Sequence, residues 1–578
     1  MAENNHTRYA LNWKIAGQAG EGVMVAAKIM AKICKRHGLQ AFNYLEYPSL
    51  IKGGHQTGQV YAAKAQASCQ RRQLDMLINL DLKGFTEHAD EISSETVIIS
   101  DSNSGKVTDE IRLSCPAKII ELPLLNLSKE STGGILAANM IALGSSAYLL
   151  GLNLDIAKQV VTEEFQEKGP EVVAKDIAAL DHGFNAVQSC CGIIQQVEVT
   201  PDNSILVTAS EAIGLGALAA GVQFYSGYPM TPSTGVLQFL ASQQDRYPLV
   251  VKHAEDEIGA INHALGASFA GVRSMTGSSG GGFALMVESI SLAGVSETPL
   301  VILEAQRKGP ATGLPTWTEQ ADLHFVINAG HGDFPKIVLT PGTVAEHFGL
   351  TKLAFHLAEK YQLPVIILSD KYILESHQTM LKPDEVQTLE RQSLVSEVDA
   401  NYQRYQLSEL GISPRTIPGQ TGGAFLANSY EHASDGFAVE DAQTTKEQVD
   451  KRARKLLAAA QEIPQPYLVG PNQADVTFVS WGSTVNVLQD LVAEQQKLEL
   501  EQTLNAIHLP CLWPFPSESF SKLANSAKQL VMVEANQSGQ GRRLIRQQTG
   551  IEIEQSINRY DGRPFYIEDL ITWLKEKK

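Results

Sequence analysis

The sequence predicts an α/β protein built from three α/β regions. Strand-like apolar runs alternate with helix-like runs, an order typical of sheets with connecting helices. Glycine-rich loops stand repeatedly between a strand-like run and the helix-like run that follows it. The length of 578 residues is too great for a single core and suggests three or four domains.

Composition and charge restrict the class of partner. Hydrophobic residues make up 43% and charged residues 19%, as in globular proteins. The formal net charge of −17 argues against binding to nucleic acid or to a membrane surface, because both are bound by positively charged protein surfaces. The start MAENNHTRYALNWK lacks an apolar signal core, and no apolar run is long enough to span a bilayer. We therefore expect a soluble, cytoplasmic protein with no nucleic-acid or membrane partner.

The cysteines and histidines indicate no metal site. The six cysteines lack CxxC spacing, and the 14 histidines show no HExxH or comparable pattern. We expect reduced thiols and no metal bound by this chain.

The strand-like and helix-like runs set four expected segments. Residues 1–190 open with a strand-like run around Trp13, a glycine loop and a helix-like run at 23–38, followed by strand-like runs at 75–80 and 96–100. Residues 200–375 contain further strand-like runs, among them 299–306, 336–340 and 363–370. Residues 376–470 are polar and are interpreted as an elaborated linker, and 471–578 as a smaller α/β domain.

Two glycine motifs of the first region are candidates for ligand binding. GQAGEG carries Gly17, Gly20 and Gly22 between a strand and a helix, where backbone N–H groups can approach an anion. The order GxxGxG is not the dinucleotide fingerprint, so a phosphate-bearing ligand and a tight turn both remain open. YPSLIKGGHQTGQV adds Gly53 and Gly54, with Lys52 and His55 beside them. Facing one another, the two loops would form a basic, glycine-lined cleft.

The stretch FYSGYPMTPST suggests a helix start that also binds a ligand. Proline disfavours the α conformation in the residue before it, so Thr231 fits an N-cap and Pro232 the first helical position. A capping hydroxyl keeps one O–H to donate, and it could reach a carboxylate at the positive helix end. Tyr228–Pro229 is not explained by the cap.

Two further segments carry charged candidates. In HAEDEIGAINHALG, Glu255, Asp256 and Glu257 open a helix, where carboxylates complement the macrodipole. SMTGSSGGGFALM repeats the order of strand, glycine loop and helix. Arg307 follows a buried strand in a Gly/Pro-rich loop, a position suited to clamping a carboxylate, although surface arginines are common.

Together these segments resemble one family. GYPMTPST, EDEIGAINHALGASFAG, SSGGGFALM and QRKGPATGLPTWTEQADL resemble the alpha subunit of the 2-oxoacid:ferredoxin oxidoreductases. GQAGEG with YPSLIKGGHQTGQV resembles the gamma domain of these enzymes, fused here at the N-terminus. ISPRTIPGQTGG with EHASDG resembles the linker of the 2-oxoglutarate-type branch. The resemblance implies a Rossmann-like gamma domain, a thiamine diphosphate pyrimidine-type domain and a transketolase C-terminal-like domain.

The resemblance also implies the reaction and the cofactors. Such enzymes decarboxylate a 2-oxoacid with thiamine diphosphate, transfer the acyl group to coenzyme A and pass electrons to ferredoxin, or run in reverse. Gly-Asp-Gly and cluster-type cysteine spacing are absent from this chain. A beta subunit is therefore expected to carry the diphosphate-binding domain, Mg²⁺ and a [4Fe–4S] cluster, in an αβ heterodimer or a dimer of it.

The resemblance further implies roles for individual residues. Glu257 matches the glutamate that binds the aminopyrimidine ring and favours its imino tautomer, with Glu255 as the rival by sequence. Thr231 and Arg307 match residues that bind the substrate carboxylate, with Tyr228 beside them. The glycine loops, with Lys52, would receive the phosphates of coenzyme A.

Two alternatives to 2-oxoglutarate oxidation remain open at this point. One is an enzyme of the same family specific for pyruvate or a branched-chain 2-oxoacid. The other is a non-catalytic scaffold that binds coenzyme A or a nucleotide, against which the joint presence of Glu257, Thr231 and Arg307 argues.

Overall fold

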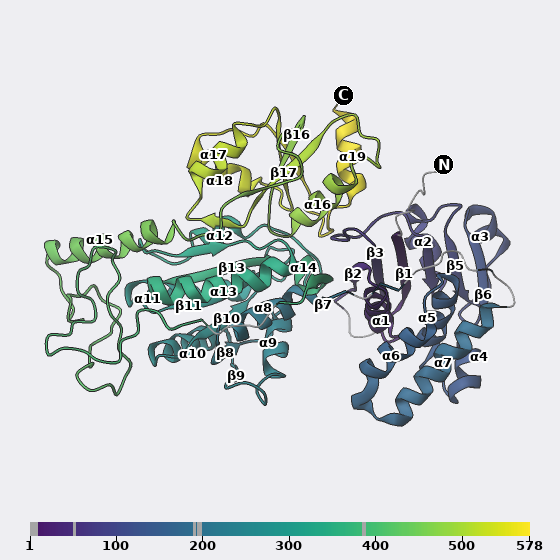
Figure 1. Cartoon of the computed structure of the whole chain (residues 1–578), viewed down its shortest axis with the longest axis horizontal. Helices are drawn as coiled ribbons and strands as arrows, with labels where there is room; N and C mark the ends of the chain where they lie inside the picture. The colour runs from purple at the N-terminus through teal and green to yellow at the C-terminus, as the bar shows by residue number, and fades with distance from the viewer. Residues whose placement is uncertain are drawn as a thin grey trace. The chain divides into compact units, whose positions relative to one another are not determined.

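Two compact units make up the part of the chain that the structure describes. The structure is a computed structural model, and it describes residues 10–49, 54–188, 192, 199–200, 202–383 and 389–577. The first unit comprises Met1–Val207, Ser376–Lys382 and Tyr566–Lys578, and the second Thr208–Glu375 and Pro383–Phe565. Their strands form three sheets, and helices connect the strands (Figure 1). This arrangement confirms the predicted α/β class.

The first unit is built on an eight-stranded mixed sheet in the order β6-β5-β4-β1-β3-β2-β14-β7. Its strands are β1 (Ala10–Gln18), β2 (Gln40–Glu46), β3 (His55–Ala63), β4 (Met76–Asn79), β5 (Val97–Asp101), β6 (Lys118–Leu122), β7 (Ser204–Thr208) and β14 (His377–Leu381). Its helices are α1 (Val23–Arg36), α2 (Gly84–Glu87), η1 (Ala89–Glu91), α3 (Asp109–Ser114), α4 (Leu124–Thr132), α5 (Ala138–Leu149), α6 (Leu154–Phe165), η2 (Gln166–Lys168), α7 (Pro170–Gln188) and α19 (Ile567–Glu576). The strands predicted at 75–80 and 96–100 and the helix predicted at 23–38 are present as β4, β5 and α1.

The core of this unit follows from the alternation of its strands. Trp13 and Ile15 of β1 point into a large apolar cluster shared with α1, α5, α6 and α7. Lys14, between them, points to the opposite face. The opposite edge of α1 is partly exposed, and there Lys28 and Lys32 both bind Glu164 of α6, at 2.8 and 2.5 Å. This edge of α1 is therefore in contact with a second helix.

The second unit contains two sheets. The seven-stranded sheet has the order β18-β12-β13-β11-β10-β8-β9 and the five-stranded sheet the order β15-β17-β16-β19-β20. The strands are β8 (Phe224–Gly227), β9 (Val250–His253), β10 (Ser274–Ser278), β11 (Leu300–Gln306), β12 (Ile337–Leu339), β13 (Pro364–Asp370), β15 (Tyr467–Val469), β16 (Val476–Trp481), β17 (Leu504–Leu509), β18 (Cys511–Trp513), β19 (Leu530–Glu534) and β20 (Gln555–Asn558). The helices are α8 (Ala209–Ala219), α9 (Thr234–Ala241), α10 (Glu257–Phe269), α11 (Gly280–Val295), α12 (Leu323–Ile327), α13 (Val344–Tyr361), α14 (Lys371–Glu375), α15 (Ala442–Ala459), η3 (Gly482–Thr484), α16 (Val485–Glu494), α17 (Ser517–Ala524) and α18 (Gln540–Thr549).

The seven-stranded sheet is parallel except at β18, and this arrangement fixes where loops gather. Strands β8 to β13 pair in parallel, so their carboxyl ends lie along one edge. Ile302 and Leu368 lie in a core cluster with α10, α11 and α12. The same cluster includes Trp481 and Ile507 of the five-stranded sheet, so one apolar core joins the two sheets of this unit.

Two segments from the C-terminal part of the chain pack with elements that come much earlier in the sequence. β18 belongs to the last predicted domain, yet it pairs with β12 of the seven-stranded sheet. α19 belongs to the first unit, where Asp569 binds Arg72 at 3.0 Å. The three-domain boundaries drawn from the sequence stay a prediction.

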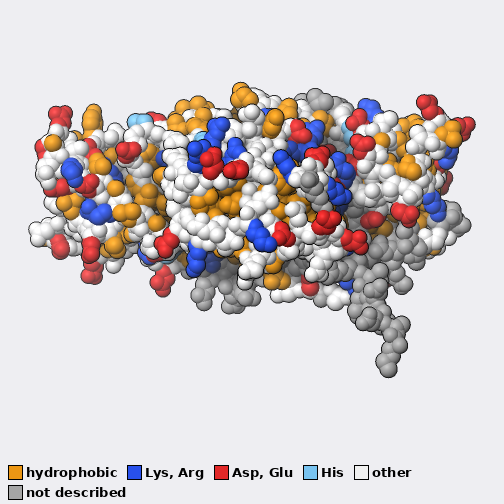
Figure 2. Space-filling view, turned by 90° about the horizontal axis from the view of Figure 1, so that it is seen from above, with side chains coloured by type: hydrophobic (Ala, Val, Ile, Leu, Met, Phe, Trp, Pro, Cys, Tyr) orange, Lys and Arg blue, Asp and Glu red, His pale blue; other side chains and the backbone are white. Residues whose placement is uncertain are grey.

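The surface carries mixed charge. In the face shown in Figure 2, acidic and basic side chains are interspersed with apolar ones. No helix among the described residues is long and apolar enough to cross a membrane. Cys34 and Cys511 are buried free thiols, and burial raises the pKa of each to about 12.

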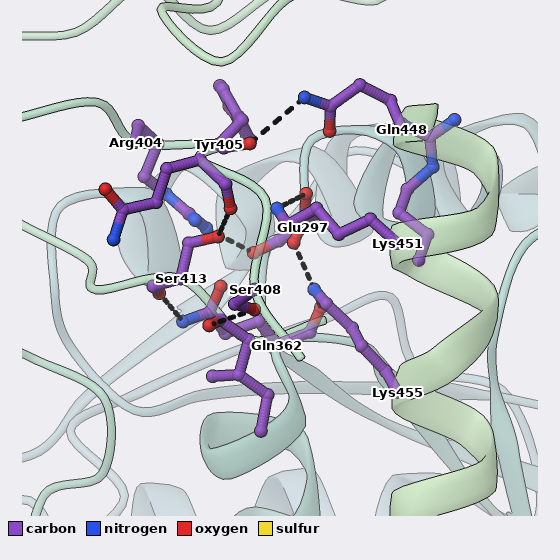
Figure 3. A network of polar contacts seen from close by, with 12 residues as sticks. Glu297, Gln362, Arg404, Tyr405, Ser408, Ser413, Gln448, Lys451 and Lys455 are labelled. Carbon is purple, nitrogen blue, oxygen red and sulfur yellow. Dashed lines mark hydrogen bonds and ion pairs between the residues drawn. The ribbon is translucent and has the colours of Figure 1, made fainter. Parts of the chain in front are cut away.

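A buried charge network fixes the predicted linker to the second unit (Figure 3). Lys451 and Lys455 of α15 both bind the carboxylate of Glu297, just after α11, and Lys451 does so at 2.6 Å. The Arg404 guanidinium donates to the Glu297 backbone carbonyl at 2.9 Å. The Glu297, Lys451 and Lys455 side chains are all 0% exposed. The polar sequence of this segment therefore reflects buried ion pairs as well as solvent contact.

Candidate active site

The predicted site residues of the second unit gather at the carboxyl ends of its parallel strands. Tyr228 and Thr231 follow β8, Glu257 follows β9, and Arg307 follows β11. Loops at this edge of an open parallel sheet are the usual ligand position, because helix N-termini and loop backbone groups face the same crevice.

Glu257 is a buried carboxylate at the start of α10. Asp256 caps this helix by accepting from the Gly259 amide at 2.7 Å. Glu257 is only 4% exposed, and the Ser278 hydroxyl donates to its Oε1 at 3.4 Å. Glu255, the rival by sequence, is exposed to solvent. Burial thus distinguishes Glu257 from Glu255, the two carboxylates that the sequence offered for the same role.

Gly282 leaves the space in which the Glu257 carboxylate lies. A Cβ at this position would come within 2.4 Å of Glu257 Oε1 and 2.1 Å of Ser278 Oγ. Gly282 stands in the first turn of α11, so its missing side chain lets a carboxylate approach a helix N-terminus. No residue of the segment SMTGSSGGGFALM was among the site residues expected from the sequence.

Thr231 and Arg307 are in direct contact. The Arg307 guanidinium donates to the Thr231 backbone carbonyl at 2.8 Å. Next to Thr231, the Met230 sulfur lies 3.7 Å from Ser278 Oγ, the same hydroxyl that reaches Glu257. Arg307, the Met230–Thr231 loop, Ser278 and Glu257 therefore form one continuous set of neighbours.

The predicted helix cap at Thr231 is wrong. α9 begins at Thr234, and the residue before it is Ser233. The amide and hydroxyl of Ser233 both donate to the Met230 carbonyl, at 2.9 and 2.7 Å, so a turn precedes the helix. The peptide between Thr231 and Pro232 is cis. No capping hydrogen bond from the Thr231 side chain is formed within the described residues, and its hydroxyl remains available for a ligand.

The electrostatics of this edge combine one arginine with several carboxyls. Burial lowers the pKa of Arg307, which is only partly exposed. Burial also raises the pKa of Asp322 to about 6, and the Glu319 charge adds to that shift. Glu304 on β11 is fully buried, and burial followed by the charges of Asp322 and Asp370 raises its pKa well above the usual range.

Tyr228 lies at the rim of the loop. It is 39% exposed, and its ring centre lies 6.3 Å from that of His253 at the end of β9. It shares the loop with Thr231, although no hydrogen bond between described residues connects its hydroxyl to Arg307 or Glu257.

The two glycine motifs of the first unit are in contact. The Ala19 amide donates to the Gly54 carbonyl at 3.4 Å. Gly20, Gly22 and Gly54 have φ values of 104°, 75° and 83°, which favour glycine. Gly17 packs close to Leu80, where a Cβ would come within 3.0 Å of the Leu80 Cβ. Lys52 and Gly53 lie outside the described residues.

Three carboxyl groups lie around this loop, whereas Lys52, on which the basic cleft depended, is outside the described residues. Burial raises the pKa of Glu21 within the loop, and the charges of Asp81 and Asp101 raise it further. Asp81 follows β4 and Asp101 ends β5, so the parallel strands deliver both carboxylates to the same edge. The sequence did not reveal this, because the three residues are far apart along the chain.

Two protein-family models match parts of this chain. The model "Pyruvate flavodoxin/ferredoxin oxidoreductase, thiamine diP-bdg" matches residues 215–451, and "Pyruvate ferredoxin/flavodoxin oxidoreductase" matches residues 12–186. A 2-oxoacid:ferredoxin oxidoreductase subunit alpha from Sulfolobus sp is 31% identical over 97% of this chain and 96% of its own. A 2-oxoglutarate synthase subunit KorA from Methanothermobacter marburgensis is 32% identical over 57% of this chain and 87% of its own.

A solved structure matches nearly the whole chain. It is a 2-oxoglutarate:ferredoxin oxidoreductase from Magnetococcus marinus with 2-oxoglutarate, coenzyme A and succinyl-CoA bound, with a TM-score of 0.91 and 32% identity over 98% of this chain and 99% of that one. The resemblance drawn from the motifs is thereby confirmed. This chain belongs to the family of 2-oxoacid:ferredoxin oxidoreductase alpha subunits.

Proposed function

We propose that this chain is the gamma–alpha fused subunit of a 2-oxoglutarate:ferredoxin oxidoreductase, which converts 2-oxoglutarate and coenzyme A to succinyl-CoA and CO₂ with electrons passing to ferredoxin, or the reverse. The observation that carries the proposal is the continuous set formed by Arg307, the Met230–Thr231 loop, Ser278 and Glu257. Similarity to the Magnetococcus 2-oxoglutarate:ferredoxin oxidoreductase and the Methanothermobacter 2-oxoglutarate synthase subunit supports 2-oxoglutarate as the substrate.

The residues around Glu257 fit the aminopyrimidine end of thiamine diphosphate. The carboxylate is nearly buried, its hydrogen bond among described residues comes from Ser278, and Gly282 leaves room beside it. A carboxylate in such a site can hold a proton shared with a ring nitrogen at Oε1 or Oε2. When bound, thiamine diphosphate supplies the nucleophilic carbon that adds to the 2-oxoacid and takes up the electrons released with CO₂.

Arg307 and Thr231 are suited to orient the substrate carboxylate. Arg307 uses one N–H group on the Thr231 carbonyl, which fixes the guanidinium plane and leaves other N–H groups for a ligand. The Thr231 hydroxyl can donate to the same ligand. In this role the two residues hold the 2-oxoacid but do not transfer protons.

Arg307→Ala is expected to raise the KM for the 2-oxoacid by about 10- to 100-fold, because a charge-assisted hydrogen bond contributes about 1.5–3 kcal/mol. The turnover number should change less. Steady-state kinetics of the complex with varied 2-oxoacid measure both constants. Arg246→Ala, at an exposed arginine of the same unit, is the matched control. An unchanged KM would remove Arg307 from the substrate site.

A beta subunit is proposed to complete the site. The chain has no Gly-Asp-Gly, so we assign the diphosphate-binding site and Mg²⁺ to the partner. The [4Fe–4S] cluster and the docking site for ferredoxin are assigned to the same partner. An αβ heterodimer, or a dimer of it, is the proposed assembly.

The isolated chain is expected to show no coenzyme A-dependent reduction of a viologen dye, whereas the chain co-expressed with its partner should reduce the dye with 2-oxoglutarate. The measurement compares 2-oxoglutarate, pyruvate and a branched-chain 2-oxoacid on the same preparations. Turnover by the isolated chain would contradict the shared site. Faster turnover with pyruvate would overturn the proposed substrate and leave the family unaffected.

The glycine loops around Gly17, Gly20, Gly22 and Gly54 are proposed to contact coenzyme A. Since Glu21, Asp81 and Asp101 repel phosphates, the uncharged pantetheine arm suits the described part of this loop better than the diphosphate does. The proposed contact therefore differs from the one expected from the sequence.

A further inference from the structure

A small cavity lies in the second unit, where the predicted linker packs against the start of β10 and against α13. Its volume is about 10 Å³, roughly the space that one water-sized particle occupies. Four charged side chains line it: Arg273 just before β10, Glu359 of α13, and Arg391 and Arg415 of the linker. The rest of its lining is serine or apolar. Three guanidinium groups and one carboxylate therefore surround the cavity.

The Glu359 carboxylate already accepts from two of these guanidinium groups. Arg273 donates from Nε and from one Nη to Oε2, at 3.0 and 2.7 Å, and Arg391 Nε donates to Oε1 at 2.5 Å. The other N–H groups of Arg273 donate to the backbone carbonyls of Ala220, Leu389 and Glu390. Every N–H group of Arg273 thus has an acceptor, and both carboxylate oxygens of Glu359 have a donor.

The third guanidinium, that of Arg415, has no carboxylate partner of its own. Arg415 is only 4% exposed, and one Nη donates to the Ser268 carbonyl at 2.8 Å. Its Nε is buried and has no acceptor within the described ranges. Burial, and next the charge of Arg404, lower the pKa of Arg415 to about 10, so the side chain is still a cation at neutral pH. A buried charged donor without an acceptor costs free energy, so the cavity favours a ligand that accepts at Nε.

The charge around the cavity favours an anion over water. Three guanidinium groups against one carboxylate leave two uncompensated positive charges among the described lining residues. The charge of Arg404 adds to this excess, because its neighbouring carboxylate, Glu297, also binds both lysine ammonium groups of α15 (Figure 3). Charges removed from water are stable only when they are paired. A water molecule can accept at Nε, but it cannot neutralise this charge.

We propose that this cavity binds one monatomic anion, chloride under ordinary conditions, which accepts from Arg415 Nε and joins the linker to the seven-stranded sheet. The volume excludes polyatomic anions such as sulfate, phosphate or a carboxylate. Arg391, whose side chain is 33% exposed, forms the side through which the ion exchanges with solvent. None of the described residues of the candidate active site lines the cavity, so the anion site does not depend on the proposed reaction.

Diffraction from crystals of the complex with its partner subunit tests for the ion directly. The crystals are grown in sodium bromide and measured at the bromine absorption edge, because bromide replaces chloride and scatters anomalously. An anomalous peak is expected in the cavity, in hydrogen-bond contact with Arg415 Nε. Electron density for a water molecule at this position, without an anomalous peak, would overturn the proposal.

Thermal melts of the same complex test whether the ion stabilises the protein. Chloride replaces gluconate, an anion too large for the cavity, at a constant ionic strength that holds charge screening fixed. Once chloride exceeds its Kd, each further tenfold rise should raise the Tm of the wild type by about 1–3 °C, because the ion binds the folded state only. Arg415→Met should lose this dependence. Arg246→Met, at an exposed arginine of the same unit, is the matched control and should keep it.

The two measurements together decide the outcome. A bromide peak with the same Tm in chloride and in gluconate would mean an adventitious ion only, and would overturn the proposal. An undiminished chloride dependence in Arg415→Met would also overturn it, because the ion would then act elsewhere. Should Arg415→Met fail to fold, the bromide peak and the chloride dependence of the wild type still decide, since neither requires a variant.

Discussion

Glu257→Gln is expected to lower turnover of the complex by about 10²- to 10⁴-fold, the usual contribution of a positioned acid–base group. Glutamine keeps the size and the hydrogen-bonding capacity of the side chain but cannot hold a proton on an oxygen as the carboxylate does. The Ser278 hydroxyl can still donate to the amide oxygen, so the fold should persist. Dye-reduction kinetics measure the loss, and circular dichroism with a thermal melt checks the fold.

Glu255→Gln is the matched control for this experiment. Glu255 lies two residues away and is exposed, so the variant should keep nearly full turnover. Gly282→Ala offers an independent check, because its Cβ would come within 2.4 Å of Glu257 Oε1 and displace the carboxylate. Near-wild-type rates in Glu257→Gln would show that the carboxylate has no acid–base role.

Glu297→Gln is expected to destabilise the protein by about 3–5 kcal/mol, the usual cost of removing one partner from a buried ion pair. Glu297 is the acceptor for both lysine ammonium groups of α15 (Figure 3). The variant leaves Lys451, Lys455 and Arg404 together without a neutralising carboxylate, in a region where these side chains are almost fully buried. Chemical denaturation followed by tryptophan fluorescence measures the change.

The pH dependence of this effect has a definite sign. Burial raises the pKa of Glu297, but the charges of Lys455, Lys451 and Arg404 lower it far more, to well below its usual value. A lowered folded-state pKa contributes stability that is present above the unfolded value of 4.5 and lost as the pH falls below it. The difference in free energy of unfolding between wild type and Glu297→Gln should therefore become smaller in acid.

Glu462→Gln is the control for the buried network. Glu462 pairs with Lys360 and His356 at a partly exposed site, where such pairs contribute about 0–1 kcal/mol. Replacing Glu297, Lys451 and Lys455 together by methionine should recover much of the loss, since apolar groups remove the unpaired charges. If Glu297→Gln lowers the free energy of unfolding by less than about 1 kcal/mol, the network does not contribute to stability as proposed.

The sequence by itself determined the α/β class and the family, and it predicted Glu257, Thr231 and Arg307 as site residues. These features depend on local patterns, because strand and helix runs, glycine loops and proline positions are visible within a few residues. Only the tertiary structure decided which carboxylate is buried, since the burial of Glu257 depends on Ser278 and Gly282 of later elements.

Contacts between residues far apart in the sequence also explain what the sequence did not predict about charge. The helix-like run around Lys451 and Lys455 was interpreted as part of a polar linker because its counter-charge, Glu297, lies more than 150 residues earlier. Asp81 and Asp101 reach the loop around Gly17 only through parallel strand pairing, so the sequence did not place these carboxyl groups beside it. Charge at a site is a sum over spatial neighbours, which a linear pattern does not contain.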